Sequence, residues 1–517
     1  MTTKTDQPTR VEAAPGRRLH LAGLADWLLA LVVGLSVLAV HDVGYILRAP
    51  FWLDEAWVAA TVRAPLGMVG SLTSSTPIGF TLLLRLVPFG GPERLRLVPL
   101  AFAGLAAAVA YLLGRELRLT RYATGLLTGA AALLSPAMLI RDDLKQYTAE
   151  AFACLLIWYL VARAENRQGW PRLIAIAVVT CVGVLVAETL LFTGVAALAA
   201  LGIECVIRRR WPELVRVAIT GACMCVILLV EYLVFMKPNQ NASLHSYWNG
   251  YYIPASPWPA ARFIAQKLLV LAPDMGFRWF ALDALGALAG IVALVWLRRY
   301  ALAVLLPLIL VIQIAGSVAG KYPFGDTRTS TFWLVLVPVL MAIAVAAIGQ
   351  ATRKVPVAIA LTAVALAVWV PATQSYMRTH LIPDENVRAQ VDYVLAHFKP
   401  GDVIVVSSSS RYGFDYYYPD PPTAYLPDTH SPVAWVPAYP GQPWIVMTTD
   451  RTTQTVDAAM TTARQVAARG HGRIWIIRSH LIPGETVAFN ADLKGDLVTN
   501  THVGGQDPLL LYYPSTS

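Results

Sequence analysis

An acidic pair, Asp54 and Glu55, lies in an aromatic setting (FWLDEAW, residues 51–57) directly after the first long apolar run. Carboxylates beside a membrane are costly unless they are paired or used, and burial gives them the proton affinity of a general base. The alternative is a helix N-terminus at which Asp54 caps the first turn. The residue types alone leave catalysis and capping equally open.

A second polar segment, residues 141–147, carries two cations and a phenol. On a helix, Arg141 and Lys145 are four residues apart and share a face, as do Asp143 and Tyr147. Two cations on one face suit a phosphate group, and a phenol can hydrogen-bond a phosphate or a sugar hydroxyl. The alternative is that these cations anchor a helix end among lipid headgroups.

Further candidates lie in three other segments. Arg328 follows Tyr322 in a Pro- and Gly-containing stretch, and irregular backbone at membrane depth needs protein or a water-filled cavity around it. Arg328 is therefore a second candidate for phosphate binding, against the alternative of an ordinary loop. Arg85 and Trp248 are candidates for substrate contact, although the aromatic loop around Trp248 also fits an interfacial belt.

Composition identifies the setting of these residues. Of 517 residues, 56% are hydrophobic and 14% charged, and the mean hydropathy is +0.54, whereas a soluble domain has roughly 25% charged residues. The net charge of +9 does not indicate nucleic-acid binding, because the cations occur in short clusters between apolar runs. The five cysteines lie in apolar runs and the nine histidines lack a ligand spacing, so no disulfide framework or metal site is indicated.

Eleven apolar runs have about the 20-residue length that a bilayer requires. They are residues 27–47, 95–114, 122–140, 148–164, 173–187, 190–207, 214–236, 279–297, 301–320, 332–348 and 355–370. The polar tail, residues 1–20, precedes an uncleaved first span and is expected in the cytoplasm. Residues 21–372 are then a transmembrane domain. Acids at span ends, such as Glu188, are expected to face a polar cavity or one of the cations.

One short run, residues 77–88, decides the topology. If it does not span, five basic loops fall in the cytoplasm, which is the side that Arg and Lys prefer. These loops contain Arg115/Arg118/Arg121, Arg163/Arg167, Arg208–Arg210, Arg298/Arg299 and Arg353/Lys354. The same reading places the polar segments on the outer face. They are residues 48–94, 141–147, 237–278, 321–330 and 373–517.

The C-terminal region, residues 373–517, has the shorter apolar runs of a soluble domain. Helices are predicted at 387–398 and 456–468. Strands are predicted at 403–407, 444–448, 474–477 and 509–513. This alternation favours a small α/β sheet. Residues 407–413 follow a strand, where ligands often bind, but a polar connecting loop is the simpler interpretation.

Taken together, residues 27–370 resemble the GT-C superfamily of membrane glycosyltransferases, in particular the polyprenyl-phosphate-sugar-dependent branch related to protein O-mannosyltransferases and aminoarabinose transferases. The resemblance rests on motif order: the acidic pair at 54–55, STPIGF at 75–80, ERLRLVP at 93–99, SP at 135–136 leading to DLKQY at 143–147, and YPFG at 322–325 leading to Arg328. The chain departs from it at Thr76-Pro77-Ile78, where relatives often have a basic residue and paired prolines. Arg85 or Lys145 is a candidate substitute for that cation.

The resemblance implies a polytopic helical fold and inverting sugar transfer from a polyprenyl-phosphate donor to an acceptor hydroxyl of a glycan, glycolipid or protein. Asp54 would be the general base and Glu55 would assist it. Arg141, Lys145, Tyr147 and Arg328 would bind the donor phosphate, with Arg85, Asp143, Tyr322 and Trp248 as further substrate contacts. No divalent metal is required, although other branches of the superfamily use one. Mannose is the first expectation for the sugar and a pentose such as arabinose the second.

Two other functional classes fit a polytopic chain. A transporter or lipid flippase would usually show paired repeats, which the sequence lacks, and its polar residues would gather at the midplane. A non-catalytic scaffold would use the outer domain to bind envelope components. Transfer from a polyprenyl-phosphate sugar separates both classes from the enzyme.

Overall fold

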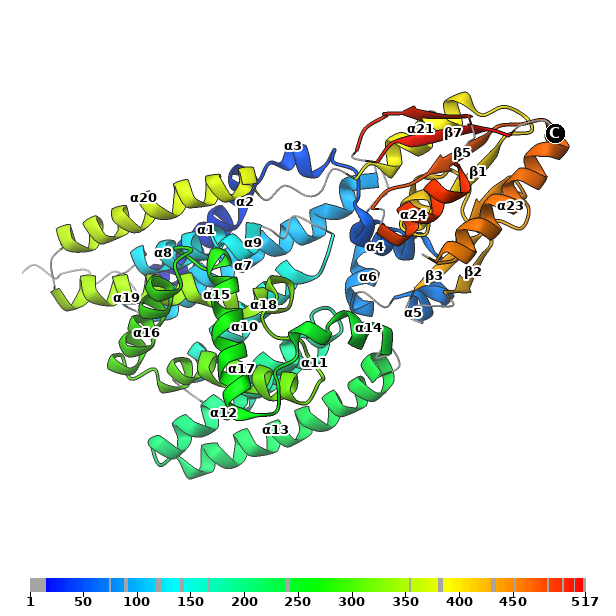
Figure 1. Cartoon of the computed structure of the whole chain (residues 1–517). Helices are drawn as coiled ribbons and strands as arrows, with labels where there is room; N and C mark the ends of the chain where they lie inside the picture. Colours follow the sequence, from blue (N-terminus) through cyan, green and yellow to red (C-terminus); the bar gives the residue numbers. More distant parts are fainter. Residues whose placement is uncertain are drawn as a thin grey trace, which may run out of the picture.

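The computed structural model describes residues 15–514 with short gaps at 74–75, 88–91, 118, 120–121, 140–143, 166–167, 238–241, 353–354, 380–384, 429–433, 451, 481–482, 495–496 and 506. A helical bundle precedes an α/β domain, and the short helices α4, α5 and α6 lie between the two parts (Figure 1). Arg141 and Asp143 of the sequence analysis fall outside the described residues.

The bundle contains an apolar helix at each of the eleven predicted positions. These helices are α1 (Pro15–Leu35), α7 (Leu97–Glu116), α8 (Ala123–Leu133), α10 (Tyr147–Ala164), α11 (Trp170–Val184), α12 (Leu190–Ile207), α13 (Trp211–Glu231), α16 (Phe280–Trp296), α17 (Tyr300–Val318), α19 (Leu336–Thr352) and α20 (Val355–Thr379). Within the described residues, seven stretches are long and apolar enough to cross a membrane alone, and four shorter apolar helices accompany them. The chain is a multi-pass membrane protein, as predicted.

Shorter helices gather around the polar segments. They are α2 (Val37–Val40), α3 (Val43–Ile46), α4 (Leu53–Arg63), α5 (Val69–Leu72), α6 (Ile78–Leu84), α9 (Pro136–Leu139), α14 (Ala242–Tyr247), α15 (Pro257–Leu271) and α18 (Thr327–Leu334). Helix α6 has seven residues, or about 10 Å of rise, against a bilayer core of about 30 Å. The prediction that residues 77–88 do not span is therefore confirmed.

Helix α6 is fixed by a close backbone approach. Gly79 N donates to Leu185 O at 2.7 Å, and a Cβ at position 79 would lie 2.5 Å from that oxygen. Because every other residue carries a Cβ, only glycine fits here without a shift. The contact joins the first polar segment to the α11–α12 connection.

Several of the basic loops contact one another. Arg299 donates to Glu116 O at 2.7 Å and to Ala162 O at 3.1 Å, and Arg208 donates to Arg298 O at 2.6 Å. Three of the five predicted cationic loops, together with Ala162 at the end of α10, are thereby brought together, as one shared membrane face requires.

The α/β domain is built on a five-stranded sheet in the order β4-β1-β5-β7-β6. Its strands are β1 (Val403–Val406), β4 (Ile445–Met447), β5 (Ile474–Ile477), β6 (Leu497–Thr501) and β7 (Leu509–Tyr513), and β2 (Ala424–Pro427) pairs with β3 (Trp435–Ala438) separately. Strands β4, β1 and β5 run parallel, while β7 and β6 are antiparallel. The helices are α21 (Val387–His397), α22 (Arg411–Tyr417), α23 (Thr453–Gly470) and α24 (Pro483–Asp492).

The loop after β1 is closed within the domain. Ser408 N donates to Glu485 Oε1 at 3.1 Å, and Arg411 pairs with Asp428 at 2.8 Å. All four of these residues are buried. The contacts agree with the simpler interpretation of residues 407–413 as a polar connection.

Helix α4 is the element on which the α/β domain packs. Trp57 stacks on Tyr412 with ring centroids 5.0 Å apart. At the helix N-terminus, Leu53 N donates to Glu385 Oε2 at 2.9 Å. At its C-terminus, Arg63 donates to the carbonyl oxygens of Asp415 and Tyr416. The domain therefore holds both ends of α4.

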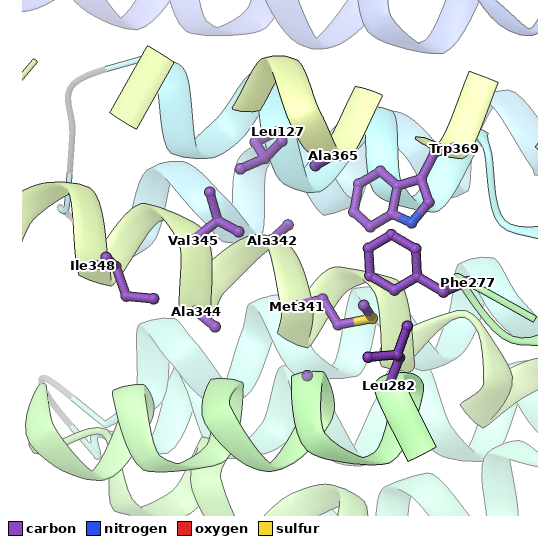
Figure 2. A pocket seen from close by; sticks show the side chains of 11 residues that line it. Leu127, Phe277, Leu282, Met341, Ala342, Ala344, Val345, Ile348, Ala365 and Trp369 are labelled. Atoms are coloured by element: carbon purple, nitrogen blue, oxygen red, sulfur yellow. The ribbon is translucent and has the colours of Figure 1, made fainter. Parts of the chain in front are cut away.

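A cavity of about 180 Å³ lies among α8, α16, α19 and α20. Figure 2 shows the Phe277 and Trp369 rings facing one another at one end, with Met341 and Leu282 beside them. The lining carries no charged side chain. Because sugar transfer and phosphate binding need polar groups, this cavity is not the candidate active site.

Candidate active site

The first turn of α4 presents Asp54 and Glu55 in opposite ways. The helix starts after Trp52, and successive residues point about 100° apart around a helix. Glu55 accepts a hydrogen bond from Trp52 N at 3.4 Å and so takes the capping role that the sequence analysis considered for Asp54. Asp54 instead points to a cation on a distant helix.

Glu55 forms a fully buried ion pair with Arg96. Glu55 Oε1 accepts from Arg96 Nε at 2.6 Å and from Leu144 N at 2.8 Å, while Oε2 pairs with Arg96 Nη2. Arg96 also donates to Ile46 O at 2.8 Å and Ala49 O at 2.6 Å. Both Glu55 oxygens are therefore occupied by protein donors. The hydrogen bond from Leu144 N to Glu55 joins the first polar segment, residues 48–94, to the second, residues 141–147.

Asp54 lies across from Arg328 at the start of α18. The Asp54 Oδ2 to Arg328 Nη1 distance is 3.7 Å, and the two side chains keep 28% and 25% of their surface accessible. Asp326, the N-cap of α18, accepts from Arg328 Nε at 3.1 Å and from Arg328 N at 2.8 Å. The cation is thus oriented by its own helix start while it remains open to a ligand.

Trp248 and Tyr247 complete the surroundings of Arg328. The Arg328 guanidinium lies 5.3 Å from the Trp248 ring centroid, and its Nη2 donates to Tyr247 Oη at 3.1 Å. An aromatic face beside an anion-binding guanidinium also offers a stacking surface for a sugar ring. The structure thus brings Asp54, Arg328 and Trp248 together from three segments.

Lys145 and Tyr147 lie at the start of α10. Lys145 is buried and follows Leu144, whose N–H binds Glu55. Tyr147 is the first residue of α10 and interacts electrostatically with Arg328 and Tyr322. Two of the predicted phosphate contacts, Arg328 and Tyr147, therefore lie near each other.

Arg85 and Tyr322 have defined structural partners. Arg85 Nη1 donates to Val62 O at 2.8 Å and to Ala64 O at 2.7 Å, which closes the end of α4. Tyr322 is half-buried, and its hydroxyl donates to Thr329 O at 3.3 Å. Burial raises the pKa of Tyr322 well above its ordinary value, so the phenol stays neutral and able to donate. Arg85 thus faces helix backbone, whereas Tyr322 faces the site.

Arg96 is the residue that sequence reasoning missed. It lies in the ERLRLVP segment, which was read only as the entry to a span. A useful signal was an arginine at the beginning of an apolar helix, where a charge is costly unless it is paired. Its partner is 41 positions earlier, so spacing alone could not name Glu55.

Comparisons with known proteins address the fold. No model of a protein family matches the chain, and neither does any curated protein sequence. Among solved structures, ArnT from Cupriavidus metallidurans bound to undecaprenyl phosphate superposes with a TM-score of 0.51 at 11% identity, over 97% of this chain and 99% of that one. Its apo form gives 0.53 at 12% identity, over 98% and 99%. The chain has an ArnT-like GT-C fold.

The ArnT-like fold covers the helical bundle and the α/β domain together, since nearly the whole of both chains superposes. It confirms the polytopic GT-C architecture with a C-terminal α/β domain. At this level of identity it does not establish which residues act. The described residues contain no group of three or more His, Cys, Asp or Glu side chains arranged to hold a metal ion.

Proposed function

We propose that this chain transfers a sugar from a polyprenyl-phosphate donor to an acceptor hydroxyl at the outer face of the membrane, with inversion. The observation that carries the proposal is the approach of Asp54 to Arg328, which joins a carboxylate and a cation from segments more than 270 residues apart. The ArnT-like fold supports it, because one of the similar ArnT structures is bound to undecaprenyl phosphate.

Asp54 is the general base in this proposal. Its partly open carboxylate accepts the acceptor's hydroxyl proton as the oxygen attacks the anomeric carbon. When a donor phosphate binds Arg328, the carboxylate is released from that contact and becomes available for the proton.

Arg328 stabilises the leaving phosphate. The bond between the anomeric carbon and the phosphate oxygen breaks, and the polyprenyl phosphate leaves with the added negative charge, which a fixed guanidinium stabilises directly. In this proposal Tyr147, which lies near Arg328, and Lys145 share the binding of this anion. Arg141 belongs to the same proposal by sequence. Because the phosphate monoester leaves as an anion, the scheme needs no metal.

Glu55 is a positioning residue in this scheme. With Arg96 and Leu144 N on its oxygens, it fixes the start of α4 against the second polar segment. It touches no open space in which an acceptor could bind, as its side chain is fully buried. This role corresponds to the orienting part of the expectation that Glu55 assists or orients Asp54.

The first experiment replaces Asp54 with Asn in the full chain and measures transfer of radiolabelled sugar from polyprenyl-phosphate mannose and polyprenyl-phosphate arabinose in membranes. Loss of a general base should lower the rate about 10²- to 10⁴-fold. The matched control is Asp457→Asn, which changes an exposed acid on α23. Full activity of Asp54→Asn would remove the base assignment. Wild-type protein that transfers neither sugar would favour a transporter or a scaffold.

A further inference from the structure

Two acids, the buried Glu150 and the half-buried Glu188, lie next to the candidate phosphate site. Glu150 is 3% exposed and follows Tyr147 by three residues on α10, which places it about 4.5 Å further along the helix. Glu188 comes from the α11–α12 connection, and the two carboxyl groups are close enough to interact. Tyr322 interacts with both and with Tyr147, which links the pair to the site.

The groups around this pair are polar, although the region is enclosed by helices. Gln146 and Thr189 lie against the Glu150 carboxyl. Within the described part of the chain, Glu150 Oε2 and Gln146 Oε1 are buried without a hydrogen-bond partner. Buried polar atoms are normally satisfied, and two such atoms side by side indicate a polar ligand or water.

The charge of the pair is also unbalanced. The groups that interact with the Glu150 carboxyl among the described residues are Glu188, Thr189 and Gln146, and none is a cation. Burial raises the pKa of Glu188 to about 7. The pair therefore presents several carboxyl oxygens as hydrogen-bond acceptors, which matches the hydroxyl groups of a sugar.

We propose that Glu150 and Glu188 bind the hydroxyl groups of the donor sugar, with Tyr322 and Gln146 completing the pocket. This inference rests on the proposed function, since it needs the donor phosphate at Arg328 and Tyr147. A sugar ring joined to that phosphate extends about one helical turn beyond it, which is the offset of Glu150 from Tyr147. The carboxyl pair selects a neutral sugar and repels an acidic one.

The test compares two lipids on the full-length protein in nanodiscs. Equilibrium binding of polyprenyl phosphate and of polyprenyl-phosphate mannose or arabinose is measured for wild type, Glu150→Gln and Glu188→Gln. Each substitution should weaken binding of the sugar lipid about 10- to 100-fold, the effect of losing a charge-assisted hydrogen bond. Binding of bare polyprenyl phosphate should change less than about twofold, which also reports that each variant is folded.

Each other outcome has a distinct meaning. Unchanged binding of the sugar lipid by both variants, or an equal loss for both lipids, overturns the sugar pocket while the proposed function stands. A loss seen only in the apparent KM for the acceptor overturns it in favour of an acceptor site. Wild type that binds neither lipid overturns the proposed function itself. Glu213→Gln, at the start of α13 and outside the site, is the matched control.

Discussion

Asp54 and Glu55 are neighbours in sequence, but they belong to two regions with opposite properties. We call Glu55 with Arg96 the inner pair and Asp54 with Arg328 the open pair. The inner pair has no accessible side-chain surface, whereas the open pair keeps about a quarter of its surface accessible on each side. A buried ion pair fixes structure because each oxygen already has a donor, while an open pair can exchange its partner for a ligand.

The largest expected effect is on the inner pair. Glu55→Ala leaves the Arg96 guanidinium buried without its carboxylate, which should lower the free energy of unfolding by about 3–5 kcal/mol. Thermal unfolding of the purified protein measures the loss. The double variant Glu55→Met/Arg96→Met, which removes both charges, should recover most of it. A single variant as stable as wild type would contradict the division into two regions.

The second prediction concerns the open pair. Arg328→Gln should reduce kcat/KM for sugar transfer about 100-fold, or roughly 2.7 kcal/mol of transition-state stabilisation, with little change in thermal stability. Arg328→Lys should restore only part of the rate, because an ammonium cannot form the planar fork of a guanidinium. Arg262, on the neighbouring α15, provides a control for general loss of charge as Arg262→Gln. Equal destabilisation by Arg328→Gln and Glu55→Ala would contradict the distinction between the inner pair and the open pair.

The smallest expected effect tests how the α/β domain supports the inner pair. Tyr417 Oη accepts from Phe51 N at 2.8 Å, just ahead of α4. Tyr417→Phe removes this partly buried hydrogen bond and a long one from Tyr417 Oη to Glu93 Oε1 at 3.5 Å, and it should cost about 1 kcal/mol of unfolding free energy. The rate of transfer should fall less than about threefold. Tyr393→Phe, in α21, is the control. A large loss of activity without loss of stability would indicate that Tyr417 acts in the reaction and not only in supporting α4.

Some of this architecture could be predicted from sequence because it depends on local properties. Long apolar runs place the eleven helices, and the short run at 77–88 yields only the seven-residue α6. The order of strands in the α/β domain follows no local pattern, and neither does its packing against α4. Those contacts depend on partners that lie more than 300 residues apart.

Part of the neighbourhood of the candidate site could be predicted from sequence, but the division of roles within it could not. Arg328 lies beside Asp54, and Trp248 and Tyr147 lie near Arg328. That these residues bind a donor stays a prediction. Asp54 and Glu55 have different partners because they point in different directions from α4 and because Arg96 pairs with Glu55. Neither the direction nor the partner can be predicted from two neighbouring residues in the sequence. Glu150 lies within the apolar run 148–164, and a single acid in such a run does not by itself indicate a binding site.

The hydrogen bonds between the α/β domain and both ends of α4 have a consequence for biogenesis. Leu53, Phe51 and Arg63 receive their partners from residues 332 to 366 positions later. At about 5–20 residues per second, the ribosome adds those partners roughly 20 to 70 seconds after α4 has been synthesised. The helix that carries Asp54 therefore gains these contacts only after the α/β domain has been synthesised and has folded against it.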